Sequence, residues 1–112
     1  MAQTTAPVAM TDIQKLADQI VERLKPCRVI LFGSYASGMP TADSDVDLLV
    51  VMRDPPGWRE ASRIKTEWQS QFPATLQIHF MASQKFEETR NVIGGIAYPA
   101  SHNGKLLYEQ NP

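Results

Sequence analysis

This sequence has little cysteine, no large excess of charge of either sign and no long apolar run. The single cysteine, Cys27, cannot form an internal disulfide, and beside Pro26 it is expected to pack rather than to react. With 11 Lys and Arg residues against 12 Asp and Glu residues, the chain lacks the broad basic surface that binds duplex nucleic acid, so a nucleotide is the favoured ligand. No stretch reaches membrane-spanning length and no signal peptide is evident, so we expect a cytoplasmic protein without membrane contact.

The overall composition is that of an ordinary globular domain. The chain has 112 residues, of which 43% are hydrophobic and 21% charged, which suits one compact core. Residues 1–10 show no apolar periodicity and are expected to form a flexible lead. Residues 11–112 are expected to form a single domain.

Apolar spacing predicts the secondary structure of the first half. A helix is expected over residues 12–24, with Thr11 as its N-cap and Gln14 completing a capping box. The branched residues 29–31 show no alternation, which is typical of a central strand buried on both faces. A second strand is expected over residues 46–52.

The second half continues with helices and strands. Trp58 and Trp68 fall at helical spacing and are expected in the core, and Ser83 is a candidate helix cap. The elements expected are a helix over 58–72, a strand over 75–81, a helix over 83–93, a turn over 101–104 and a brief strand over 105–109. Their order predicts an α+β fold, a small mixed β-sheet flanked by helices.

Small residues join the first two expected strands. Gly33 and Ser34 open a turn whose size allows the backbone to approach a ligand closely. A short helical turn starting near Ser34 would point free N–H groups outward.

Two aspartates, Asp45 and Asp47, interrupt the start of the second strand. Side chains two apart on a strand point the same way, so these carboxylates are expected roughly 6.5–7 Å apart along the chain on one face. Such a pair can converge on Mg²⁺, which prefers oxygen ligands and is completed by phosphate and water. Unpaired carboxylates at this position would be costly without a cation.

The spacing of Gly33-Ser34, ten residues and then Asp45-Val46-Asp47 resembles the G-S-x10-D-x-D motif of the DNA polymerase β-type nucleotidyltransferase superfamily. Residues 29–109 share the resemblance, and the small size is similar to that of its minimal nucleotidyltransferase branch. The resemblance implies that Gly33 and Ser34 hold the triphosphate of an NTP, and that Asp45 and Asp47 bind Mg²⁺ and are catalytic. Members of the superfamily transfer a nucleoside monophosphate to a hydroxyl group and release pyrophosphate.

Many members also carry a third carboxylate on a later strand, where this sequence holds Gln77. Glutamine has no charge to offer a metal and cannot act as a base. Three explanations stay open. His79, on the same strand face, serves as the catalytic base; a partner chain supplies the acceptor site and its base; or the domain binds nucleotide with little or no turnover.

The resemblance also implies a partner, because so short a chain lacks the acceptor-recognising domain of larger members. Minimal nucleotidyltransferases are commonly paired with HEPN-domain proteins in toxin–antitoxin modules. The leading hypothesis is therefore a Mg²⁺-dependent enzyme that transfers AMP from ATP, or another NTP, to a hydroxyl of a HEPN-like partner. The alternative is a catalytically weak or inactive module that neutralises the partner by contact, and transfer to a small molecule is less favoured.

Overall fold

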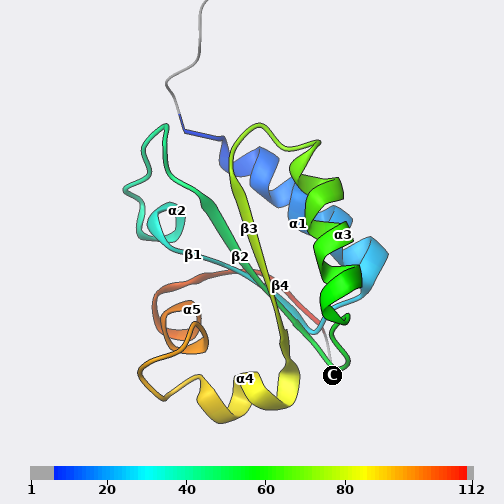
Figure 1. The fold of residues 1–112 in the computed structure, drawn as a ribbon. Helices are drawn as coiled ribbons and strands as arrows, with labels where there is room; N and C mark the ends of the chain where they lie inside the picture. Colours follow the sequence, from blue (N-terminus) through cyan, green and yellow to red (C-terminus); the bar gives the residue numbers. More distant parts are fainter. Residues whose placement is uncertain (1–6, 111–112) are drawn as a thin grey trace, which may run out of the picture.

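The structure, a computed structural model, describes residues 7–110. Figure 1 shows an α+β fold in which helices lie on both sides of one sheet. Along the chain lie α1 (Met10–Leu24), β1 (Arg28–Phe32), α2 (Ser34–Ser37), β2 (Val46–Met52), α3 (Trp58–Gln69), β3 (Leu76–Ala82), α4 (Ser83–Thr89), α5 (Ala97–Asn103) and β4 (Lys105–Glu109). None of these helices is long and apolar enough to cross a membrane.

The strands form one mixed sheet in the order β3-β2-β1-β4. β1 pairs antiparallel with both β2 and β4, whereas β2 and β3 run parallel. The two central strands are the most apolar, and Val29, Leu31, Leu48 and Val50 are fully buried within them. The predicted central strand, the second strand and the mixed sheet flanked by helices are therefore confirmed.

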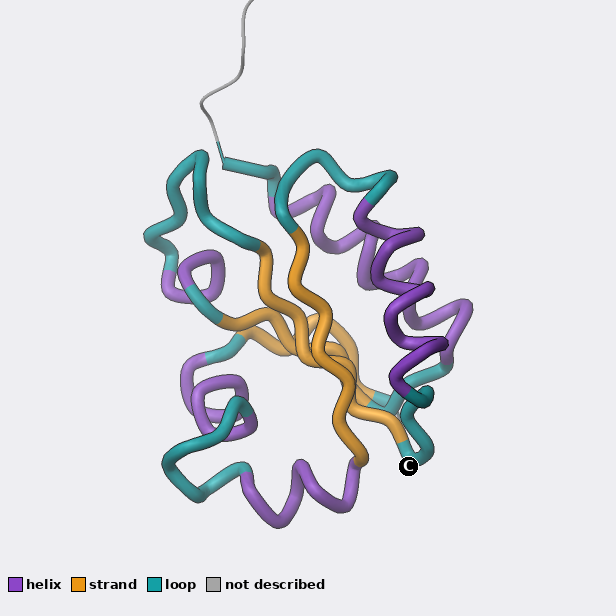
Figure 2. The backbone as a smooth tube through the Cα atoms, in the orientation of Figure 1, coloured by secondary structure: helices purple, strands orange, loops and turns teal. Residues whose placement is uncertain are grey.

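Helices cover both faces of the sheet (Figures 1 and 2), and each face has its own apolar core. α1 and α3 cover one face, where Ile20, Leu48 and Val50 belong to the larger cluster. α4 and α5 cover the other face, where Leu49 and Val51 pack with residues of both helices. Because side chains alternate along β2, Asp47 lies on this second face.

The start of α1 differs from the prediction. The helix begins at Met10 after Ala9, whose carbonyl accepts the N–H groups of Asp12 and Ile13, and no side chain caps it. Thr11 is therefore not the N-cap and the capping box is wrong, because Met10 packs against the core and draws the helix start backwards. Of the expected lead, residues 1–6 lie outside the described part of the chain.

Other predictions in the second half are also wrong, among them the helix over 58–72, which ends at Gln69 as α3. Trp58 is 78% exposed, because it is the first residue of α3 and precedes the positions that face the sheet. Ser83 is the first residue of α4, and no side chain caps this helix. α4 ends at Thr89, so Val92 and Ile93 lie beyond it and are exposed.

α5 covers residues 97–103, where the sequence predicts only a turn over 101–104, so that prediction is wrong. Its third residue is Pro99, which normally argues against a helix. Proline is tolerated in a first helical turn because the N–H groups there have no intrahelical acceptor. The predicted terminal strand after it is confirmed as β4.

Candidate active site

The turn after β1 is built around Gly33, whose backbone has φ 80° and ψ −156°. Only glycine adopts this combination without strain. The N–H groups of Ala36 and Ser37 donate to the Gly33 carbonyl at 3.1 Å and start α2, which confirms the expected short helical turn. The N–H groups of Ser34 and Tyr35 precede these bonds and donate to no acceptor among residues 7–110.

Asp47 lies directly against this turn. A Cβ atom built on Gly33 would be 2.6 Å from Oδ2 of Asp47. In the sheet, Asp47 is the Cα partner of Phe32, the residue just before Gly33. Position 33 therefore requires glycine for its backbone angles, and a Cβ atom there would also displace the Asp47 carboxylate.

Asp45 enters β2 from a tight turn. Thr41 donates its N–H to Ser44 Oγ at 2.8 Å, and the Ser44 N–H donates to the Thr41 carbonyl at 3.1 Å. On the other side of Asp45, the Val46 N–H donates to the Thr75 carbonyl at 2.9 Å. These bonds fix the backbone on both sides of Asp45, whose side chain is half-buried.

Burial and two neighbouring groups shift the pKa of Asp47. Burial is the largest influence on the pKa of Asp47 and raises it above the ordinary 3.8; nearby His79 lowers the pKa, and the charge of Asp45 raises it. Neither carboxylate has an ion-pair partner within the described range. A cation between them would relieve both the repulsion and the cost of burial.

The donor set of Asp45 and Asp47 fits a divalent metal ion that arrives with its substrate. No three His, Cys, Asp or Glu side chains in the described residues are grouped so as to hold a metal by themselves. Mg²⁺ is commonly held by one or two carboxylates, with waters and substrate phosphates in its remaining positions. The pair therefore suits a metal–nucleotide complex better than a closed structural site.

β3 brings Gln77 and His79 to the same face. Gln77 is the Cα partner of Asp47, and His79 is the partner of Leu49. The residue beside Asp47 is thus an amide and not an acid. Burial lowers the pKa of His79 below 6.5, while Asp47 raises it and Lys65 lowers it, so the imidazole is neutral at neutral pH.

Two further residues near this site are not predicted from the sequence. Phe32 packs beside His79, with ring centroids 5.6 Å apart. Its position immediately before Gly33 is the feature of the sequence from which its place near the site could be predicted. Lys65 of α3 is close enough to affect the pKa of His79, although no local pattern links the two.

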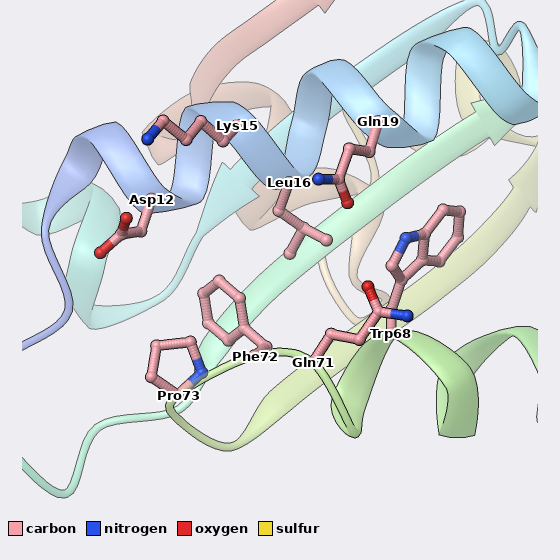
Figure 3. Close-up of a pocket in the computed structure, with 8 residues that line it drawn as sticks. All are labelled: Asp12, Lys15, Leu16, Gln19, Trp68, Gln71, Phe72 and Pro73. Atoms are coloured by element: carbon pink, nitrogen blue, oxygen red, sulfur yellow. The ribbon is translucent and has the colours of Figure 1, made fainter.

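A pocket of about 220 Å³ lies elsewhere, between α1 and the end of α3. Figure 3 shows Leu16 of α1 and Phe72 pointing toward each other there, with Lys15 and Asp12 at the rim. None of the predicted site residues lines it. It lies on the face covered by α1 and α3, opposite to Asp47, and takes no part in the candidate site.

This chain is similar to known proteins in sequence and in fold. Residues 13–96 match the profile of the family described as nucleotidyltransferase domain. A Methanocaldococcus jannaschii protein with the provisional name protein adenylyltransferase is 49% identical over 37 residues. That match spans 33% of this chain and 37% of the relative.

Solved structures with the same fold include two toxin–antitoxin complexes. A chain of a toxin–antitoxin complex with AMP-PNP has a TM-score of 0.66 at 19% identity. The match covers 92% of this chain and 75% of the other chain. A chain of the complex between tri-AMPylated Shewanella oneidensis HEPN toxin and MNT antitoxin has a TM-score of 0.61 at 15% identity. That match covers 90% of this chain and 72% of the other chain. The likenesses show the fold, and the family match over residues 13–96 shows that this chain belongs to the nucleotidyltransferase domain family.

Proposed function

We propose that this chain is a Mg²⁺-dependent nucleotidyltransferase that moves AMP from ATP to a hydroxyl group of a HEPN-like partner protein. The observation that carries the proposal is the packing of the Asp47 carboxylate against Gly33, at a turn whose Ser34 and Tyr35 N–H groups are free. Support for AMP and for a protein acceptor comes from relatives, since one is provisionally named a protein adenylyltransferase and another complex contains a tri-AMPylated HEPN toxin.

In this proposal each residue has a separate task. Gly33 and Ser34 bind the triphosphate, with the N–H groups of Ser34 and Tyr35 donating to phosphate oxygens. Asp45 and Asp47 would hold Mg²⁺, which offsets the charge on the phosphates and on the departing pyrophosphate.

The transfer itself is an in-line displacement. The acceptor oxygen forms a bond to the α-phosphorus of ATP, and the bond from that phosphorus to the oxygen shared with the β-phosphorus breaks, so that pyrophosphate leaves with that oxygen. The acceptor proton passes to His79. Its imidazole can accept a proton because burial lowers its pKa and keeps it neutral at neutral pH.

Gln77 supports a second candidate, in which the domain neutralises its partner by contact with little or no turnover. It is the direct neighbour of Asp47 on β3, and it cannot bind a metal as a carboxylate does. In that case, replacement of both aspartates would leave binding and neutralisation intact.

One experiment separates the two functions. ATP labelled on its α-phosphate is mixed with Mg²⁺, the chain and the HEPN-domain protein that co-purifies with it. We expect label on the partner with the wild type, and at least a hundredfold loss with Asp45→Asn/Asp47→Asn. Equal labelling by the variant contradicts the enzyme proposal, while neutralisation without any labelling by either protein favours the contact module.

A further inference from the structure

We propose that the outer edge of β3 binds an extended segment of the acceptor protein as an additional strand. This inference rests on the proposed function, and it names how the acceptor reaches the site.

The hydrogen bonds at the start of β3 show which of its backbone groups face the outer edge. The Thr75 carbonyl accepts from Val46 and so points toward β2, whereas the Leu76 N–H donates to Gln69 Oε1 at 2.7 Å and points away. These directions alternate along a strand. Ile78 and Phe80 therefore present their N–H and C=O groups at the outer edge, where β3 has no partner strand in residues 7–110.

The side chain of Gln69 already imitates a neighbouring strand at the beginning of this edge. Its Oε1 accepts the Leu76 N–H, and its Nε2 donates to the Ala74 carbonyl at 2.8 Å. One amide side chain thus supplies the acceptor and donor that a peptide group would supply. Its contacts end at Leu76, and the edge beyond it is free for a real peptide.

The other edge of the sheet, β4, is much less suited to strand addition. Its pairing with β1 is interrupted by a register shift between Val29 and Ile30, and Gln14 Nε2 of α1 lies 3.5 Å from the Leu107 carbonyl. Short strands with bulges and lysines are devices that discourage edge pairing. β3, in contrast, has seven residues in uninterrupted register with β2.

A strand added to β3 would carry side chains to the candidate active site. Every second side chain of the added strand would lie on the face that carries Asp47 and His79. Neighbouring strands are about 4.8 Å apart, so its backbone would lie one spacing from His79 and two from Asp47. A hydroxyl on that face would approach the metal-binding pair, which is why the occupant is an acceptor segment and not a second copy of this chain.

The test is an NMR titration of the full ¹⁵N-labelled chain, with ATP and Mg²⁺ present. The probe is a peptide that alternates valine and threonine between terminal lysines. We expect the largest shifts at the Ile78 and Phe80 amides, and hydrogen exchange there that is at least about tenfold slower at saturation. Shifts concentrated on β4 or on the helices, or no saturable shift, overturn the inference.

Variants and a modified peptide isolate the backbone bond. Phe80→Pro removes one outward N–H without touching the pairing to β2 and should weaken peptide binding about tenfold, whereas Phe80→Leu keeps that N–H and should bind within about twofold of wild type. The same peptide with all internal amides N-methylated should not bind, which keeps the inference testable if the proline variant fails to fold. Equal binding by the two variants, or binding of the methylated peptide, contradicts the inference.

Two further readouts separate this inference from its foundation. Sedimentation of the free chain should show a monomer, since a dimer that protects Ile78 and Phe80 would assign the edge to a second copy. AMP transfer to the HEPN-domain partner is measured in parallel. Peptide binding at β3 without transfer refutes the proposed function alone, whereas transfer without binding at β3 refutes the edge alone.

Discussion

The α-carbon of Gly33 and the carboxylate of Asp47 are so close that a methyl group on the glycine would lie 2.6 Å from Oδ2. Real side chains do not approach this closely. The contact joins the turn expected to hold phosphates to a carboxylate expected to hold a metal. It therefore ties the two halves of the candidate site to one point between β1 and β2.

Replacement of Gly33 by alanine tests this contact. Gly33→Ala should lower the free energy of unfolding by about 2–4 kcal/mol, because it combines backbone strain with the collision. Gly38→Ala is the control: Gly38 also has a positive φ of 82°, but a Cβ there meets nothing within 4 Å. It should cost about 1–2 kcal/mol in urea unfolding.

A double-mutant cycle separates collision from strain. Asp47→Ala should recover at least about 1 kcal/mol of the loss in the Gly33→Ala background, because the colliding carboxylate is gone. Additive effects of the two substitutions would show that the contact has no energetic consequence.

Asp47 should be needed for AMP transfer and should lower the free energy of unfolding. Its pKa is raised by burial, so the folded state favours the protonated form and loses stability as pH rises above 3.8. Asp47→Asn should therefore raise the free energy of unfolding at neutral pH, by less than about 1 kcal/mol after solvent screening, while it abolishes transfer. The gain should vanish near pH 3, and a gain of the same size at pH 3 and at pH 7 would contradict this origin.

His79 should set the acidic limb of the transfer rate. The imidazole must be neutral to accept a proton, and its pKa lies below 6.5, so wild-type activity should persist to pH values below that and then fall. His79→Gln should lower the maximal rate about 10²–10⁴-fold and remove this limb, with ATP affinity little changed. An unchanged pH profile in the variant would assign the base to another group.

Gln77→Asp should supply a third carboxylate beside Asp47. Without Mg²⁺, repulsion across the two strands should lower the free energy of unfolding by about 0.2–1 kcal/mol, and Mg²⁺ should restore it. Transfer should increase. Gln77→Asn is the matched control and should change neither quantity, so equal behaviour of the two variants would argue against a metal beside this position.

Much of this architecture follows from local patterns. The apolar run of residues 29–31 predicts a buried central strand, which is β1, and the motif from Gly33 to Asp47 connects β1 to β2 as expected. The contact between Gly33 and Asp47 follows from antiparallel register, which sequence spacing alone does not determine.

The misses have tertiary causes. Trp58 has helical spacing but lies ahead of the residues that face the sheet, so periodicity alone assigns it wrongly to the core. Pro99 argues against a helix when the sequence is read alone, but proline is tolerated in the first turn of a helix, which is where Pro99 lies in α5. Lys65 is brought near His79 by the packing of α3, which no local pattern encodes.

The most direct test of the metal–nucleotide site is isothermal titration of ATP into the chain with and without Mg²⁺, for the wild type and Asp45→Asn/Asp47→Asn. We predict Mg²⁺-dependent binding to the wild type, and at least about a tenfold weaker affinity with no dependence on Mg²⁺ in the variant. Equal, Mg²⁺-dependent affinity in both proteins would contradict the assignment of these carboxylates to the metal.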